Sequence, residues 1–174
     1  MAIRQILIAP DPRLKVKARR VEKVDAKIRK LMDDMLETMY AAPGIGLAAP
    51  QVGEALQVIV VDVAREGEPR QPLRMANPEI VWASDERVPA EEGCLSLPDQ
   101  FAEVTRPAEV KVRYLDHENE IRELHAEGLL AVCVQHEMDH LQGVLFVDHI
   151  SSLRRSMILR KLAKLQKQKT AASA

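Results

Sequence analysis

The chain has 174 residues, of which 47% are hydrophobic and 29% charged, and its formal net charge at pH 7 is −1. This length suits one domain with a substantial buried core, and the composition excludes a disordered protein. The near-zero net charge excludes a general attraction to nucleic acid.

The cysteines and the apolar runs bear on the cellular compartment. The two cysteines lie in dissimilar surroundings, which favours a reducing compartment over a disulfide framework. The first 15 residues contain charged side chains and no long apolar run, so we expect no signal peptide. No apolar stretch reaches 18 residues, so no membrane span is predicted. The sequence therefore predicts a cytoplasmic protein with no membrane partner.

The predicted elements begin with a helix. Asp25 is the expected N-cap of a helix that runs to about Ala41, because apolar side chains recur there at helical spacing, and Gly44 with the following turn ends it. Three β-rich regions follow: residues 56–62, residues 73–82 with an interrupting Asn77-Pro78, and a hairpin of residues 110–115 and 120–126.

The next segment carries the chemistry. An apolar run, residues 128–134, leads into Gln135-His136-Glu137-Met138-Asp139-His140, which contains an H-E-x-x-H motif. On a helix, His136 and His140 are four residues apart, so both imidazoles leave one face and can bind a single metal ion. Glu137 lies beside them, close enough to take a proton from metal-bound water without being a ligand. Two surface histidines are the alternative, but the apolar run before them argues for burial.

The C-terminal region predicts a further helix. Residues 151–169 contain seven Lys or Arg and no acid, with apolar side chains at helical spacing, so one face would pack and the other would be basic. We expect one domain with a catalytic body, residues 1–150, this basic amphipathic helix, and a frayed tail, residues 170–174. The predicted fold class is α+β, with antiparallel β-sheets around a central metal-binding helix, an N-terminal helix and a C-terminal helix.

A catalytic metal site needs a third protein ligand. Phe146 stands where one family of zinc proteases has its third histidine, and no carboxylate follows Asp148, where another family has a glutamate. Asp148 and His149 remain candidates, but an upstream cysteine fits better. One cysteine lies between two valines, where a small core residue is the usual interpretation. Cys94 lies in an extended, Gly-flanked segment that could present a thiolate to the helix; a buried or disulfide-bonded cysteine is the alternative there.

Three motifs carry a family resemblance. They are G-I-G-L-A-A-P-Q at residues 44–51, E-G-C-L-S at residues 92–96 and Q-H-E-M-D-H at residues 135–140. In this order and with these separations, the chain resembles the peptide deformylases from about Ile3 to near residue 168. Three ordered motifs are far more specific than H-E-x-x-H alone.

The resemblance implies a site and a reaction. Cys94, His136 and His140 would hold one divalent ion, usually Fe²⁺, with Zn²⁺, Ni²⁺ or Co²⁺ able to substitute. A metal-bound hydroxide would attack the formyl carbon of an N-formyl-methionyl nascent peptide and release formate. Glu137 would act as general base and then as general acid. The oxyanion donors implied are the Gln51 side-chain amide and the Leu95 backbone N–H.

The resemblance also implies the substrate contacts. Residues around the peptide and its methionine side chain would be Ile45, Gly46, Gly93, Leu129, Val132 and Cys133; plain core packing is the alternative for the apolar ones. Phe101 stands where some bacterial members have an arginine, so we expect a different peptide preference. The pattern also suggests that Arg106 pairs with Glu92 and braces the Cys94 segment, with a surface arginine as the alternative. Asp139 would orient a ligand histidine through its second ring nitrogen, with a solvated helix residue as the alternative.

The expected partners follow from the same resemblance. A similar basic helix docks bacterial members on ribosomal RNA near the exit tunnel, so residues 151–169 predict ribosome association; a merely solvated basic face is the alternative. We expect a monomer. Two other functions compete with deformylation. One is a metallo-endopeptidase, disfavoured because its downstream ligand is missing. The other is an inactive ribosome-associated protein, disfavoured because Gln51, Cys94, His136, Glu137 and His140 are all present.

Overall fold

The computed structural model describes residues 2–173, with side chains described as far as residue 171. Seven strands form two antiparallel sheets. The larger sheet contains, in spatial order, β1 (Gly46–Ala48), β2 (Val58–Val61), β3 (Leu73–Ala83), β6 (Glu109–Leu115) and β7 (Ile121–Glu127). A separate two-stranded hairpin consists of β4 (Arg87–Cys94) and β5 (Leu97–Pro107). The helical elements are α1 (Ala26–Ala41), α2 (Gly128–His140), α3 (Ser152–Ser173) and three 3₁₀ turns, η1 (Pro12–Lys15), η2 (Ala49–Val52) and η3 (Phe146–His149).

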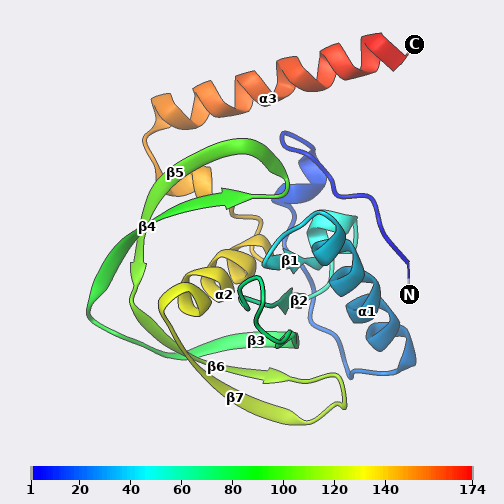
Figure 1. Ribbon diagram of the computed structural model, residues 1–174, viewed down its shortest axis with the longest axis vertical. Helices are drawn as coiled ribbons and strands as arrows, with labels where there is room; N and C mark the ends of the chain where they lie inside the picture. The colour runs from blue at the N-terminus through cyan, green and yellow to red at the C-terminus, as the bar shows by residue number, and fades with distance from the viewer. Residues whose placement is uncertain (1, 174) are drawn as a thin grey trace.

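Helix α2 occupies the centre of the molecule, between the larger sheet and the β4–β5 hairpin (Figure 1). Its apolar residues Ala131 and Val134 pack with strand residues of the larger sheet in one core cluster. A second cluster joins the hairpin to η3 through Leu97, Val104 and Phe146. Because both faces of α2 are covered, its polar residues near the C-terminal end are buried as well. The predicted fold class is confirmed.

Most of the predicted elements are present. The Asp25 side chain accepts a hydrogen bond from the Ile28 backbone N–H at 3.0 Å, so it caps α1 as predicted. The hairpin predicted at residues 110–115 and 120–126 is β6–β7. Strand β3 continues through Asn77-Pro78, where Asn77 has φ +49 and the register with β6 shifts. The interruption in the sequence therefore marks a β-bulge within the strand.

Two strand regions were missing from the prediction. Both strands of the β4–β5 hairpin contain residues that disfavour strands: Pro89 and Gly93 in β4, and Pro98 and an Asp99 with φ +61 in β5. The two strands nevertheless pair with each other, from Arg87 opposite Pro107 to Cys94 opposite Leu97. The apolar side chains of the hairpin also pack on η3, which holds the pair in place. Strand β1 has only three residues, too short to show a β pattern.

Helix α3 lies across one end of the molecule and extends beyond the rest of the fold (Figure 1). Leu162 is buried against the hairpin and η3, whereas Leu153 and Met157 are exposed. The helix continues to Ser173, so residues 170–173 are not the frayed tail that we expected; Ala174 lies outside the described residues. The tail contains no Gly or Pro, and alanine has the highest helix propensity. Within residues 2–173, no helix is both long and apolar enough to cross a membrane.

A buried ion-pair cluster at the start of the fold makes stability depend on pH. The Asp34 side chain, 1% exposed, accepts hydrogen bonds from Arg4, Lys30 and the Ala2 backbone N–H. Burial alone would raise the pKa of Asp34, but these bonds lower it from 3.8 to about 2. A carboxyl whose pKa is lower in the folded state stabilises the fold above about pH 4, and this contribution is lost as the pH falls towards 2.

We therefore predict a pH-dependent effect of Asp34→Asn. At pH 7 the free energy of unfolding should fall by about 2 kcal/mol, since one pKa unit corresponds to about 1.4 kcal/mol. The difference from the parent should shrink as the pH falls below 4, because protonated Asp34 no longer attracts Arg4 and Lys30. Denaturant unfolding at pH 7, 4 and 2.5 measures this. A difference that stays constant over that range would show that packing, not charge, is what Asp34 contributes.

Candidate metal centre and active-site cleft

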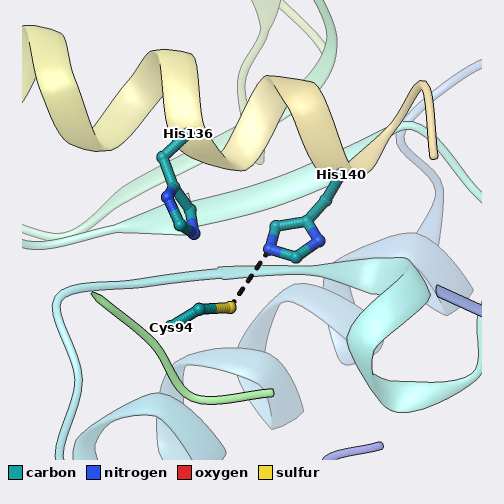
Figure 2. Close-up of side chains that lie close together, drawn as sticks. All are labelled: Cys94, His136 and His140. Atoms are coloured by element: carbon teal, nitrogen blue, oxygen red, sulfur yellow. Dashed lines mark hydrogen bonds between the residues drawn. The ribbon is translucent and has the colours of Figure 1, made fainter. Parts of the chain in front are cut away.

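Three of the predicted residues come together beside α2. One possible ligand atom from each of Cys94, His136 and His140 lies within 4.8 Å of the other two (Figure 2). The Cys94 Sγ lies 3.4 Å from His140 Nε2. Both histidines project from one side of α2 towards the end of β4, where Cys94 is located (Figure 2). Ligands of a tetrahedral metal with bonds of about 2.0–2.3 Å are themselves roughly 3.4–3.8 Å apart, which matches this spacing.

The end of the hairpin brings the thiol to the helix. Cys94 pairs directly with Leu97, with a register shift after Gly93, so the two strands are joined by a tight turn through Leu95 and Ser96. The turn directs the Cys94 side chain across to α2 (Figure 2). The spacing of the histidines is a local property of a helix, whereas the position of Cys94 depends on how the hairpin packs.

His136 is oriented by a buried ion pair. Its Nδ1 lies 2.9 Å from Glu92 Oε1, and because a carboxylate only accepts, Nδ1 carries the proton and Nε2 is left for an ion. Arg106 donates to both Glu92 oxygens, at 2.6 and 3.0 Å, which confirms the predicted pair. Burial raises the pKa of Glu92, but the bonds from His136 and Arg106 outweigh it and leave the pKa below its usual value. Glu92 therefore stays ionised.

The prediction for Asp139 is wrong. Its Oδ2 accepts from Arg106 Nη1 at 2.9 Å and lies 2.8 Å from His149 Nε2, and it contacts neither ligand histidine. Glu92 on β4 accepts the hydrogen bond from His136 instead. Asp139 contacts Arg106 on β5. The alternative third ligands are also excluded by position: His149 is bonded to Asp139, and Asp148 pairs with Lys15 and Arg155.

Glu137 is buried next to the cluster. Burial raises its pKa from 4.5 to about 7, although the neighbouring His136 opposes the rise. Its Oε1 is buried and has no hydrogen-bond partner within the described part of the chain. A methyl group added at Gly46 would lie 2.5 Å from Glu137 Oε2, so only a glycine fits there. A carboxyl with a pKa near neutrality and a free oxygen is suited to accepting and returning a proton.

The Gln51 amide reaches the same place from η2. Its Oε1 accepts from the Ala48 backbone N–H at 2.9 Å, which fixes the orientation of the amide. Its Nε2 donates to Ser96 Oγ at 3.0 Å and lies 3.5 Å from Cys94 Sγ. Leu95, whose backbone N–H was the second predicted donor, lies between Cys94 and Ser96 and lines the cleft. The Gln51 amide thus presents a fixed N–H donor to the Cys94 thiol.

The site opens into a cleft of about 600 Å³ between the hairpin turn and the segment before β1. The cleft is lined by the predicted Ile45, Gly46, Gln51, Gly93, Leu95, His136 and Glu137, and by Ile6, Ile8, Pro43 and Phe101, among others. A second cavity of about 90 Å³ adjoins it, lined by the predicted Ile45, Gly93, Leu129, Val132 and Cys133 together with His136 and Glu137. Its lining is apolar apart from residues at the site and Glu91 and Glu92. The predicted site residues thus line these two adjoining cavities, except His140, which is buried behind them and belongs to the metal-ligand group.

Some residues around the site were not predicted. Phe146, noted in the sequence only because it cannot bind a metal, stacks on His136 with ring centroids 6.2 Å apart. Ile6 and Ile8, from the segment before η1, line the cleft. No local pattern marks either contact, because Phe146 belongs to a separate 3₁₀ turn after α2, and Ile6 and Ile8 come from a segment far from α2 in the sequence.

The donor set and its surroundings fit a cation. A thiolate with two imidazoles is a donor set for a divalent transition metal. Burial alone lowers the pKa of His136, but Glu137, Cys94 and Glu92 together raise it, so these neighbours favour positive charge at this point. Burial and the positive groups around His140 lower its pKa, which keeps it in the neutral form that binds metals.

Comparisons with known proteins agree with this geometry. A family model described as polypeptide deformylase matches residues 3–156. The chain belongs to the peptide deformylase family. The peptide deformylase of Phenylobacterium zucineum is 62% identical over 164 residues, which is 94% of this chain and 97% of that protein. The peptide deformylase of Brucella suis is 52% identical over 97% of each chain.

Solved structures show the same fold. The crystal structure of peptide deformylase from Ehrlichia chaffeensis is 40% identical, with a TM-score of 0.93 over 97% of this chain and 99% of that one. The same protein in complex with actinonin gives a TM-score of 0.90 at 43% identity over 94% and 98% of the two chains. The chain is therefore a hydrolase of a metal-dependent family, and it contains a candidate metal site.

Proposed function

We propose that this protein removes the N-formyl group from the N-terminal methionine of nascent peptides, with one divalent ion bound by Cys94, His136 and His140. The observation that carries the proposal is the meeting of these three ligand atoms within 4.8 Å beside a buried Glu137, in a protein of the peptide deformylase family. We propose Fe²⁺ as the ion, with Zn²⁺, Ni²⁺ or Co²⁺ able to replace it.

The two cavities suggest how the substrate would lie. The formylated end would reach the metal centre through the larger cleft, and the methionine side chain would enter the cavity between Ile45, Leu129, Val132 and Cys133. That cavity of about 90 Å³ is about three water volumes, each about 30 Å³, which suits a short unbranched side chain. Cys133 would remain a neutral thiol there, because burial raises its pKa well above the usual value. Gly46 and Gly93 would leave room for the peptide backbone.

The residues of the chain would then share the work of hydrolysis. When bound, the divalent ion would make a water molecule acidic enough to attack at neutral pH and would polarise the formyl carbonyl. Glu137 would take the proton from the attacking water and deliver it to the departing amine. Gln51 Nε2 and the Leu95 backbone N–H would donate to the oxygen that becomes negative. The products are formate and a peptide with a free methionine amine.

The proposal is tested by the products formed from two peptides. Formyl-Met-Ala-Ser should yield formate and Met-Ala-Ser in equal amounts from the metal-loaded protein. A longer peptide without a formyl group should remain intact. Internal cleavage of that longer peptide, without formate from the first, would support the metallo-endopeptidase alternative and overturn the deformylase.

We predict that Gln51→Ala lowers kcat by about 10²–10³, the typical cost of one oxyanion donor. Ser96→Ala is the matched control, because it removes a partner of the Gln51 amide but leaves the donor itself. It should lower kcat far less. Steady-state formate release gives both values, and metal content should equal that of the parent. Equal losses in the two variants would mean that Gln51 supports the turn at Cys94 rather than the reaction.

We further propose that α3 docks on the ribosome near the exit tunnel, in the cytoplasm, with the protein acting as a monomer. Most of the basic side chains of α3 are exposed, and they lie on a helix across one end of the molecule (Figure 1), none of whose residues lines the cleft. Docking through α3 would leave the cleft open to an emerging chain.

Neutralising the exposed face should weaken this association. Because Leu162 is buried, truncation would remove part of the core, so we choose Arg160→Gln, Lys164→Gln and Lys167→Gln together. Affinity for ribosomes should fall at least about tenfold, and its dependence on salt should become less steep, because fewer counterions are released. Cosedimentation at several salt concentrations measures both.

The control carries three changes outside α3, Lys17→Gln, Lys23→Gln and Lys27→Gln, all at exposed positions. It should bind ribosomes as the parent does. Both triple variants should deformylate formyl-Met-Ala-Ser at the parent rate. Unchanged ribosome affinity in the α3 variant would refute the docking proposal without affecting the catalytic one.

A further inference from the structure

A chain of hydrogen-bonded charged groups leads from His136 to the surface. Glu92 contacts His136 Nδ1 at 2.9 Å, and Arg106 donates to Glu92 at 2.6 and 3.0 Å. Arg106 also donates to Asp139 at 2.9 Å, and His149 Nε2 lies 2.8 Å from the same oxygen, Asp139 Oδ2. In each contact, a carboxylate accepts a hydrogen bond from a guanidinium or an imidazole. The five residues thus form one continuous network.

The inner part of this network closes a ring between α2 and the hairpin. His136 and Asp139 lie three residues apart on α2, whereas Glu92 belongs to β4 and Arg106 to β5. Cys94 is two residues after Glu92 on the same strand. The separation between the Cys94 thiol and the α2 imidazoles therefore depends on how the hairpin is held against α2. The ring is the polar part of that attachment.

Asp139 is the least protected member of the ring. Its side chain is 27% exposed, whereas those of Glu92 and Arg106 are 3% and 6% exposed. A carboxylate open to water can turn away from Arg106, since water offers competing hydrogen bonds. A second donor on the same oxygen opposes that rotation, and His149 is that donor.

His149 is itself firmly placed. It ends η3, where the preceding Asp148 accepts hydrogen bonds from Lys15, from Arg155 at 2.7 Å and from the Leu145 backbone N–H at 2.9 Å. These bonds tie η3 to the N-terminal segment and to α3. The His149 imidazole thus reaches Asp139 from a fixed backbone rather than from a free loop.

We infer that His149 is a positioning residue of the metal centre. By holding Asp139 against Arg106, it keeps the hairpin and α2 in the arrangement that brings Cys94, His136 and His140 together. This inference rests on the proposed metal site and is independent of which peptide the protein hydrolyses.

The test compares two replacements of His149. His149→Phe keeps a ring of similar size but cannot donate a hydrogen bond, whereas the amide of His149→Gln can. His117→Ala is the matched control, an exposed histidine in the β6–β7 turn outside the network. Each protein is loaded with one Co²⁺. The visible spectrum of the bound ion, the rate constant for its release to excess chelator, and the unfolding temperature of the metal-free protein are measured.

We expect His149→Phe to release Co²⁺ about threefold to tenfold faster than the parent and to alter its visible spectrum. The effect should be smaller than the 10–100-fold typical of residues that contact a ligand directly. His149→Gln and His117→Ala should match the parent, and the metal-free proteins should unfold at similar temperatures. Release from His149→Phe at the parent rate would overturn the inference, and so would equally fast release from His149→Gln. A parent that binds no Co²⁺ would refute the proposed metal site and the inference together, whereas a parent that binds Co²⁺ but releases no formate would refute only the deformylase.

Discussion

Glu137→Gln is expected to lower kcat for formate release by about 10³, within the 10²–10⁴ range of general acid–base catalysis. The amide has the shape of the carboxyl but cannot accept the proton of the attacking water. The effect should be large because Glu137 is buried, with a pKa raised to about 7 by that burial and a free Oε1 beside the three ligand residues. Within the described residues, no other carboxylate lining the cleft is buried beside them.

Metal content separates this role from a loss of the site. Glu137 is not among the three grouped ligands, so Glu137→Gln should bind one ion per chain as the parent does. Glu103→Gln, an exposed carboxylate on β5, is the control and should keep the parent rate. A Glu137→Gln variant that kept its metal and more than about one tenth of the parent kcat would contradict the proton-transfer role.

Gly46→Ala is expected to lower kcat by about 10² even though position 46 has no group that reacts. The added methyl group would lie 2.5 Å from Glu137 Oε2 and 2.8 Å from Cys133 Sγ, so both side chains would have to move. The backbone cannot retreat, because Gly46 is paired with Val61 in the larger sheet. A displacement of about 1 Å at a reacting group can cost about 100-fold in rate. The overpacking should also lower the free energy of unfolding by about 1–3 kcal/mol.

Gly93→Ala provides the comparison. A methyl group there would lie 2.6 Å from Phe101 Cε1, but that ring is 58% exposed and can swing into solvent. The free energy of unfolding should change by about 0.5 kcal/mol, as for a surface substitution. Formate release measures the activity of Gly46→Ala, and thermal unfolding of both variants measures the contrast in stability. Equal losses of stability in the two variants would show that close packing around Gly46 is not what makes Gly46→Ala destabilising.

Local patterns predicted the parts of the site that lie on one element. His136 and His140 share a face because four residues are about one helical turn, and Asp25 caps α1 because its side chain reaches the third following N–H. Cys94 was favoured as the third ligand because the downstream candidates fitted poorly, and the family resemblance agreed with it. The resemblance alone added Gln51, which no spacing connects to α2. The pairing of Arg106 with Glu92 was predicted from the pattern of the Cys94 segment and is confirmed.

The errors arise where tertiary contacts decide. Asp139 lies on the same helix as His136, so it was a natural partner in the sequence, but Glu92 approaches the imidazole from β4 and takes that place. The β4–β5 hairpin is poor in strand-forming residues and exists because its two strands pair and pack on η3. Neither the contact of Glu92 with His136 nor the packing of the hairpin on η3 can be predicted from a single segment of the sequence.

The measurement that tests the central claim most directly is a titration of metal-free protein with Fe²⁺ under anaerobic conditions. Formate release from formyl-Met-Ala-Ser and bound iron are followed in the same samples. The account predicts that activity rises in proportion to bound iron and stops rising at one ion per chain, and that Cys94→Ala, which removes one of the three grouped ligands, shows neither. Full activity before any iron is added, or one bound ion with no formate released, would contradict it.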